Sequence, residues 1–306
     1  MKDLREIYNS DQFNNIDFIA NQLVEGFITG FHRSPYHGFS VEFSEHRIYN
    51  TGESTKHIDW KLFARTEKLF VKRYEEETNL RCQIIIDTSS SMQFPFDSEI
   101  NKLNFSIFSS AALINLLKRQ RDAVGLSLIS NEIEFHIDAK LSTRNNHLIY
   151  SKLEKLLEDK QKNKETNLSN LLHNIAERIH KRSLVIIFSD MLFSENIDDM
   201  FEALNHLKFN QNEIIIFHLN DNNSELEFNY KNRPYKFVDL ENNTEIKLNP
   251  NEIKGFVENK FTEYYKNIKL KCGKYKIDFV EIDINKDFSQ ILISYLIKRQ
   301  NMFNPH

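Results

Sequence analysis

Two short apolar runs that lead directly into an aspartate constrain the fold of this chain more than any other feature. The first run covers residues 84–86 and is followed by Asp87, and the second covers residues 184–188 and is followed by Ser189 and Asp190. Short apolar, β-branched runs ahead of Ser and Asp predict buried strands that stop at the carboxylate. Open α/β sheets bind ligands at the carboxyl ends of their strands. Both aspartates are therefore candidate site residues.

A carboxylate at the end of a buried strand needs a compensating partner. It loses much of its hydration there, and an ionised group out of water is costly unless it gains a cation or several hydrogen-bond donors. One interpretation of Asp87 is a capping carboxylate held by backbone N–H groups in a turn, with the following serines as N-cap residues. The other interpretation is a ligand of a metal ion.

The alternation of helices and strands after Asp87 predicts a doubly wound, mostly parallel sheet. The strand at 133–137 follows the strand at 123–129 after a three-residue turn, so these two must be antiparallel. We predict further strands over residues 184–190, 214–219 and 277–284, and helices over residues 100–119, 145–158, 166–180, 197–208, 250–271 and 287–299. The predicted fold class is α/β with one antiparallel edge strand and a small N-terminal α+β lobe.

The predicted domains are an N-terminal lobe over residues 1–80 and an α/β domain over residues 81–306. The lobe begins with a helix over residues 4–29, whose apolar spacing favours packing on the body of the protein over binding to a membrane surface. An Asn-rich, polar segment at 221–250 predicts a surface hairpin insertion, with short strands at 226–230 and 235–239.

Composition excludes several classes of protein. The chain has 306 residues, a formal charge of −4 and seven glycines, none of them in a glycine-rich phosphate-binding motif. This disfavours P-loop ATPases, Rossmann dehydrogenases and bulk nucleic-acid binding. No apolar run reaches the roughly 18 residues that cross a bilayer, and the start lacks the apolar region of a signal peptide, so we expect a cytoplasmic protein. The two cysteines predict separate reduced thiols.

The segment at 31–73 is polar, mildly basic and carries the only tryptophan of the chain. An aromatic residue among arginines is typical of an interaction surface, although a plain solvated surface is the alternative. Its small excess of positive charge would neutralise few phosphates, which leaves nucleic-acid binding as a minor option. The predicted partner-binding residues are Arg33, Arg47, Asp59, Trp60 and Arg65.

A candidate metal site combines Asp87 with two serines at alternate positions, Ser89 and Ser91. Thr166, at the start of its predicted helix, adds a hydroxyl, and Asp190 ends the neighbouring strand. Oxygen ligands without His or Cys select a hard cation, so the prediction is Mg²⁺, with Mn²⁺ as the alternative ion. With only two protein carboxylates, the ion keeps a coordination position that an outside carboxylate can fill.

The constellation of Asp87, Ser89, Ser91, Thr166 and Asp190 resembles the metal-ion-dependent adhesion site of the von Willebrand factor A domain. Asp87, Ser89 and Ser91 match its D-x-S-x-S element, Thr166 its lone threonine, and Asp190 its distal aspartate. The resemblance implies that hydroxyls and aspartates hold the metal directly or through water. It also implies that an acidic residue of a client or partner protein fills the open position.

The segment ahead of the first strand extends the resemblance over most of the chain. It is similar to the signature of a bacterial family with an A-like domain, the domain of unknown function 58 family, whose members typically accompany MoxR-type AAA+ ATPases. The chain departs from the family pattern at three places. Glu53 and Lys56 stand where Asp and Arg are commoner, and residues 162–165 replace the glycines that often precede the threonine. The matching residues are His32-Arg33-Ser34, Gly38, Glu42-Phe43, Arg47, Tyr49, Gly52, Ile58-Asp59-Trp60 and Ala64-Arg65.

Two enzymatic interpretations are alternatives to a protein-binding function. A metal-dependent phosphatase with Asp87 as nucleophile usually has a second Asp two residues later, and this chain has Ser89 there. A serine hydrolase is disfavoured because no G-x-S-x-G surrounds Ser89 or Ser91. The prediction is a non-enzymatic, Mg²⁺-dependent interaction module, an adaptor or substrate-recognition partner of a MoxR-type AAA+ ATPase in a chaperone-like assembly.

Overall fold

The computed structural model describes residues 16–31, 46–48, 60–66, 68–72, 80–96, 98, 100–158, 168–192, 197–238 and 244–303. By internal contacts the chain divides into two units, one of residues 1–28 with 80–306 and one of residues 29–79. This grouping differs from the predicted N-terminal lobe in its first helix, which belongs to the larger unit. Among the described helices, none has the length and apolar composition needed to cross a bilayer.

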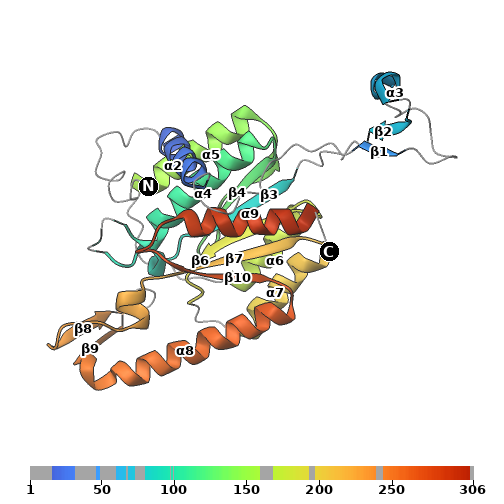
Figure 1. Cartoon of the computed structure of the whole chain (residues 1–306). Helices are drawn as coiled ribbons and strands as arrows, with labels where there is room; N and C mark the ends of the chain where they lie inside the picture. Colours follow the sequence, from blue (N-terminus) through green and yellow to red (C-terminus); the bar gives the residue numbers. More distant parts are fainter. Residues whose placement is uncertain are drawn as a thin grey trace. The chain divides into compact units, whose positions relative to one another are not determined.

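A six-stranded sheet forms the centre of the larger unit, in the order β10-β7-β6-β3-β4-β5 (Figure 1). Every neighbouring pair is parallel except β4 and β5. The predicted fold class, a doubly wound mostly parallel sheet with one antiparallel edge strand, is confirmed. The strands are β3 (Arg81–Asp87), β4 (Ala123–Ile129), β5 (Ile133–Lys140), β6 (Leu184–Ser189), β7 (Glu213–Asn220) and β10 (Asp278–Asp283).

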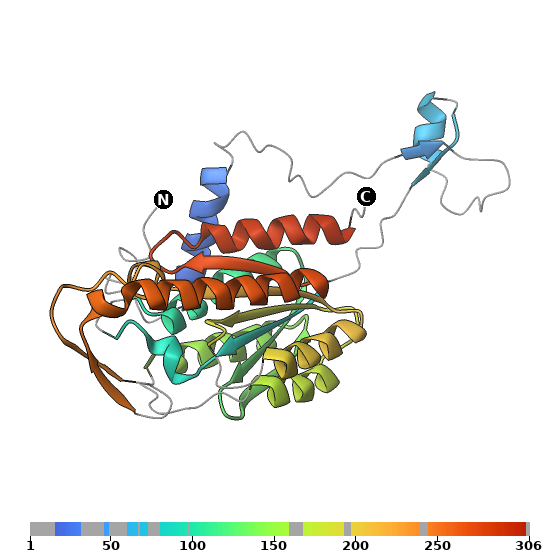
Figure 2. The same cartoon turned by 90° about the horizontal axis from the view of Figure 1, so that it is seen from below.

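Helices cover both faces of this sheet. In Figure 1, α4, α5 and α9 lie above the sheet and α6, α7 and α8 lie below it; Figure 2 shows the same layers from below. The side chains of Ile85, Ile187 and Ile216 are in register on adjacent strands and share one core with α6, α7 and α8. The helices are α4 (Lys102–Arg119), α5 (Thr143–Glu158), α6 (Leu168–Arg178), α7 (Ile197–Phe209), α8 (Pro250–Lys274) and α9 (Ser289–Phe303).

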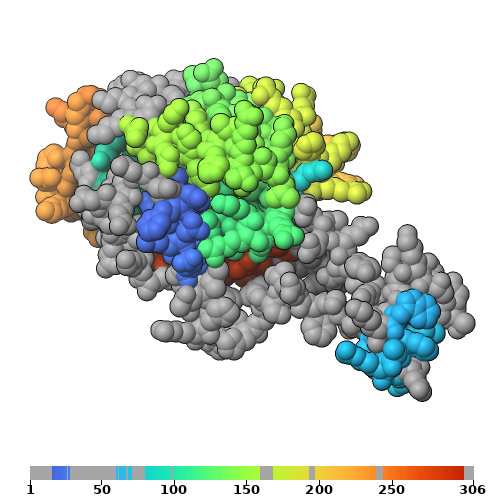
Figure 3. All heavy atoms as spheres, turned by 90° about the horizontal axis from the view of Figure 1, so that it is seen from above, coloured from blue at the N-terminus to red at the C-terminus, as the bar shows by residue number. Residues whose placement is uncertain are grey.

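The N-terminal helix α2 (Ile16–Phe31) packs on the helices α4 and α5. Figure 3 shows it in blue against α4 and α5. The side chains of Ile16, Leu23 and Phe27 are buried, and the Ile16 N–H donates to Glu154 of α5 at 3.0 Å. The apolar face predicted from its spacing therefore packs on the protein.

The insertion after β7 contains a hairpin, but its first predicted strand is wrong. Residues 222–226 form a single π-helical turn, η3, and the hairpin pairs β8 (Tyr235–Val238) with β9 (Glu245–Leu248). Phe228 and Tyr230 do alternate with polar residues, as a strand would. Their rings pack instead on the hairpin, with centroids 5.6 Å apart for Phe228–Phe237 and 5.3 Å for Tyr230–Tyr235.

The smaller unit contains a two-stranded antiparallel sheet and a short helix among its described residues. The strand β1 (His46–Ile48) pairs with β2 (Phe70–Lys72), and α3 spans Trp60–Thr66. The Trp60 and Phe63 rings meet edge to face with centroids 6.1 Å apart. Both side chains are exposed.

The two cysteines are free and fully buried, Cys82 in β3 and Cys272 in α8. Burial raises the pKa of both thiols, that of Cys272 to about 12, so the reactive thiolate is suppressed. We expect no reaction of the native protein with a thiol reagent such as DTNB, and two reactive thiols after denaturation in guanidinium. Rapid labelling of either cysteine in the native protein would contradict this burial.

Candidate functional site

The candidate site lies where β3 and β6 end side by side at the centre of the sheet. Ile86 of β3 is in register with Phe188 of β6, which brings Asp87 beside Ser189. The Ser189 hydroxyl donates to Asp87 Oδ2 at 2.8 Å, and both residues are buried. The predicted juxtaposition of these two strand ends is thus present, with a cross-strand hydrogen bond that fixes one carboxylate oxygen.

The turn after β3 directs two hydroxyls to a common point. The Ser89 N–H donates to Asp87 Oδ1 at 2.9 Å, which folds the chain back over the carboxylate before the 3₁₀ helix η2 (Ser90–Gln93) begins. Ser89 Oγ and Ser91 Oγ lie 3.1 Å apart. Adjacent oxygens of an Mg²⁺ octahedron with bonds of about 2.1 Å are separated by about 3.0 Å. The spacing of the two hydroxyls therefore matches one edge of such an octahedron.

Asp190 is held by the protein through three of its atoms. Its Oδ2 accepts from Lys102 Nζ at 2.9 Å, and its Oδ1 accepts from the Leu192 N–H at 3.2 Å. Its main-chain carbonyl lies 3.0 Å from Nε2 of the buried His218. Asp190 therefore has a fixed position beside the site and an ion-pair partner of its own.

Lys102, in the first turn of α4, is completely buried and bridges two carboxylates. Its Nζ donates to Asp190 and, at 2.5 Å, to Glu225 Oε1 in η3. The other oxygen of Glu225 accepts from the Asp221 N–H at 2.8 Å. The ammonium is thus anchored to the segment that leaves β7.

The charges of the site act on one another at short range in a dry environment. Burial, together with the neighbouring Asp190 carboxylate, raises the pKa of Asp87 to about 6, against the opposing effect of hydrogen bonds from Ser89 and Ser189. Burial alone would lower the pKa of Lys102, but the carboxylates of Asp190 and Glu225 outweigh it and raise that pKa. The lysine is therefore a permanent positive charge, and Asp87 is a carboxylate in need of a cation.

The donor set fits a hard cation at Asp87, Ser89 and Ser91. Asp87 accepts hydrogen bonds from the Ser89 N–H and from the hydroxyls of Ser89 and Ser189, and a carboxylate with about four acceptor sites keeps one for a ligand. Within the described residues no three His, Cys, Asp or Glu side chains are grouped to hold a metal. A cation at this place would thus depend on serine hydroxyls. Thr166, the predicted fifth ligand, lies outside the described residues.

The predicted partner-binding residues are only partly described. Trp60 and Arg65 lie on α3 with exposed side chains, Trp60 at 60% of its surface. Arg47 lies in β1 opposite Val71, and only its backbone is described. Arg33 and Asp59 lie outside the described residues. Their role stays a prediction.

Ser189, Lys102 and Glu225 were not among the site residues predicted from sequence. Lys102 did carry a signal: a positive charge in the first turn of a helix opposes the helix dipole, which favours acidic residues there. A lysine at the start of the first α-helix after a strand that ends in Asp indicates a carboxylate partner. Glu225 carried no such sequence signal, because its segment resembled an exposed polar loop.

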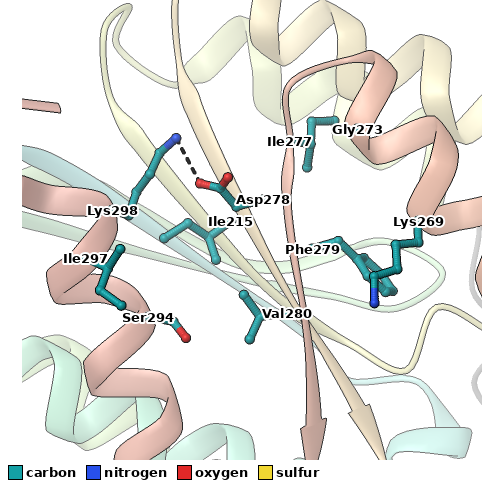
Figure 4. A pocket seen from close by; sticks show the side chains of 10 residues that line it. All are labelled: Ile215, Lys269, Gly273, Ile277, Asp278, Phe279, Val280, Ser294, Ile297 and Lys298. Atoms are coloured by element: carbon teal, nitrogen blue, oxygen red, sulfur yellow. Dashed lines mark ion pairs between the residues drawn. The ribbon is translucent and has the colours of Figure 1, made fainter. Parts of the chain in front are cut away.

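An open pocket of about 450 Å³ lies away from this site, beside the edge strand β10. Figure 4 shows that its lining comes from β10 and the flanking helices α8 and α9, with Ile215 of the neighbouring strand β7. The ion pair of Lys298 with Asp278, at 2.9 Å, stands at its wall. Asp278 begins the edge strand β10, whereas Asp87 ends the central strand β3, so the pocket and the site lie at different strands and at opposite strand ends.

The sheet order and its antiparallel edge strand define a doubly wound α/β protein. The chain belongs to the family described as protein of unknown function DUF58, whose model matches residues 45–260. An uncharacterized protein of Mycobacterium tuberculosis is 21% identical over 132 residues, which are 43% of this chain and 41% of that protein. The match thus spans less than half the length of that relative.

Two solved structures are similar to the chain. The crystal structure of the SpRpn10 VWA domain has a TM-score of 0.39 and 12% identity, and the match covers 71% of this chain and 95% of that one. An uncharacterized membrane spanning protein from Vibrio fischeri has a TM-score of 0.19 and 9% identity, over 72% of this chain and 98% of that one.

Proposed function

We propose that this protein is a non-enzymatic, Mg²⁺-dependent interaction module of the cytoplasm, which captures an acidic residue of a client or partner protein. The observation that carries the proposal is the 3.1 Å separation of the Ser89 and Ser91 hydroxyls beside the buried Asp87. Asp87, Ser89 and Ser91 would hold the ion, and Thr166 would complete the set of hydroxyls. A bound Mg²⁺ would supply a Lewis-acidic position for one outside carboxylate.

The charge around the site supports binding over catalysis. Asp87 and Asp190 are its two carboxylates, and Lys102 already neutralises part of that charge. An ion held by so few protein charges keeps a strong attraction for a further anion. For phosphatase chemistry, position 89 has a serine where an acid/base carboxylate is usual.

The partner in this proposal is a MoxR-type AAA+ ATPase, for which the protein acts as adaptor or substrate-recognition subunit. Support comes from the family resemblance and from the exposed Trp60 and Arg65 of α3, since Trp and Arg are the side chains that most often dominate binding interfaces. The two roles are separate: the site at Asp87 captures the client, and the smaller unit contacts the ATPase.

Metal binding is tested by titrating Mn²⁺, as a paramagnetic stand-in for Mg²⁺, into the purified protein and measuring free Mn²⁺ by EPR. We expect one site that Mg²⁺ displaces and that Asp87→Ala abolishes, with the circular dichroism spectrum unchanged. The matched control is Asp138→Ala, which removes an acid from the second half of the edge strand β5, near the amino end of β4, and should leave the site intact.

Partner binding is tested by pull-down of a purified MoxR-type ATPase and of client proteins. We expect Trp60→Ala to weaken capture of the ATPase and Asp87→Ala to abolish capture of clients. Client capture that persists in Asp87→Ala, or hydrolysis of p-nitrophenyl phosphate that disappears in Asp87→Ala, would overturn the proposal.

A further inference from the structure

Lys102 is the strongest feature of the molecule that the proposed function leaves unexplained. A lysine that is 0% exposed loses all of its hydration, and such a residue is retained only where carboxylates compensate it. Here two of them do so, Asp190 at 2.9 Å and Glu225 at 2.5 Å. The ammonium is thus fully compensated by carboxylates, independently of any ion at the serines, and the cluster keeps one formal negative charge.

Lys102 places its ammonium against Asp190, which follows the end of β6 beside Asp87. Asp190 receives the ammonium on Oδ2 and a backbone N–H on Oδ1, so both of its oxygens already have donors. The donors to Asp87 are all neutral: the backbone N–H of Ser89 and the hydroxyls of Ser89 and Ser189. Of the two carboxylates, Asp87 thus has the uncompensated charge.

We propose that Lys102 is a positioning residue that holds Asp190 out of direct contact with the cation and weakens cation binding at Asp87, Ser89 and Ser91. The inference rests on the proposed function, because it concerns the affinity of the same site. Its consequence is that the ion is held loosely by the protein alone and requires the partner's carboxylate for tight retention. The ammonium is a fixed charge of the same sign as the ion and lies 2.9 Å from Asp190, the carboxylate that acts on Asp87. In a buried site its repulsion of a cation is weakly screened.

Glu225 sets the strength of this effect. It shares the ammonium with Asp190, and its own position is fixed by the Asp221 N–H. Without its negative charge, the surroundings of the site become more positive and Lys102 has Asp190 as its remaining carboxylate partner. Loss of Lys102 and loss of Glu225 should therefore change cation affinity in opposite directions.

The experiment measures the Kd of Mn²⁺ by EPR for the full chain and four variants. We expect Lys102→Met to bind Mn²⁺ at least about tenfold more tightly, and Glu225→Gln to bind it more weakly. Lys102→Arg, which keeps the charge, should remain near the wild type. The double variant Lys102→Met with Glu225→Gln restores the original net charge and should return the Kd toward that of the wild type.

The outcomes separate this inference from the proposed function. If the wild type and all variants fail to bind Mn²⁺, the metal site itself is wrong. If the wild type binds and Asp87→Ala does not, but Lys102→Met leaves the Kd unchanged or raises it, only the role of Lys102 is overturned. If Lys102→Met does not fold, as judged by circular dichroism, Glu225→Gln decides: unchanged or tighter binding overturns the inference.

Discussion

Replacing Gly125 with alanine is expected to destabilise the protein by about 3 kcal/mol, because the added Cβ has no space. Gly125 lies in β4 between Gln83 of β3 and the backbone of β5. A Cβ there would lie 2.1 Å from Gln83 Oε1, 2.6 Å from the Ala139 nitrogen and 2.6 Å from the Ile137 oxygen. Two of the three clashes are with backbone atoms of β5, which can move only if the strand pair separates.

The side chain of Gln83 explains why a glycine stands there. Its amide crosses over Gly125 to donate to Ser127 Oγ at 3.0 Å and to the Ile137 carbonyl at 3.3 Å. Gln83→Ala in the Gly125→Ala background should therefore recover only part of the lost stability, since the contacts with β5 remain. Urea denaturation monitored by circular dichroism measures both effects.

Gly255 offers the matched control for this substitution. It lies within α8, and a Cβ there would meet no atom within 4 Å. Gly255→Ala should stabilise the protein by about 0.5–1 kcal/mol, because alanine loses less conformational entropy in a helix. A Gly125→Ala protein as stable as the wild type would show that β4 and β5 are not packed as described.

The sheet was predictable from sequence because each strand carries its own local signal. Residues 84–86 and 184–188 are apolar runs that end at polar residues, and strands buried on both faces require that pattern. The parallel direction of the strands follows from the alternation with helices, and the single antiparallel pair follows from the short turn at 130–132. Each of these features is determined by residues that are close together in the sequence.

The site was predictable only in part, because half of its contacts join residues far apart in sequence. Asp87 and Asp190 were found because each ends a strand. The bond from Ser189 to Asp87 and the bridge from Lys102 to Glu225 span about a hundred residues or more, and no spacing rule connects them. The strand predicted at 226–230 failed for a related reason: alternation of aromatic and polar residues also suits aromatic rings that pack on a separate hairpin.

Replacing Asp87 with asparagine is expected to stabilise the metal-free protein at pH 8, measured by urea denaturation in EDTA. The folded protein raises the pKa of this carboxyl to about 6 from 3.8, so the folded state binds its proton more tightly than the unfolded state does. The stabilisation of the folded state by this bound proton is fully present below pH 3.8 and is lost as the pH rises to about 6. The ionised carboxylate at pH 8 therefore costs up to about 3 kcal/mol, which asparagine avoids.

Magnesium should reverse the relative stability of the two proteins, so that the wild type becomes more stable than Asp87→Asn. In Mg²⁺ at pH 8 the wild type gains stability with ion concentration, whereas Asp87→Asn gains little, because only the carboxylate attracts the ion strongly. At pH 4 in EDTA the two proteins should be nearly equally stable. A wild type more stable than Asp87→Asn in EDTA at pH 8 would mean that the protein itself already compensates the charge, and the need for a cation at this strand end would disappear.

Glu213 provides a control with the opposite sign. Burial alone would raise the pKa of Glu213, but hydrogen bonds from Lys298 and Lys208 outweigh it and lower that pKa. The resulting stability is present above the unfolded pKa of 4.5 and is lost as the pH falls. Glu213→Gln should thus destabilise the protein at pH 8, with or without Mg²⁺, and by less at pH 4. Because both residues are acids at the ends of sheet strands, opposite responses would show that the cost at Asp87 arises from its own surroundings and not from acids in general.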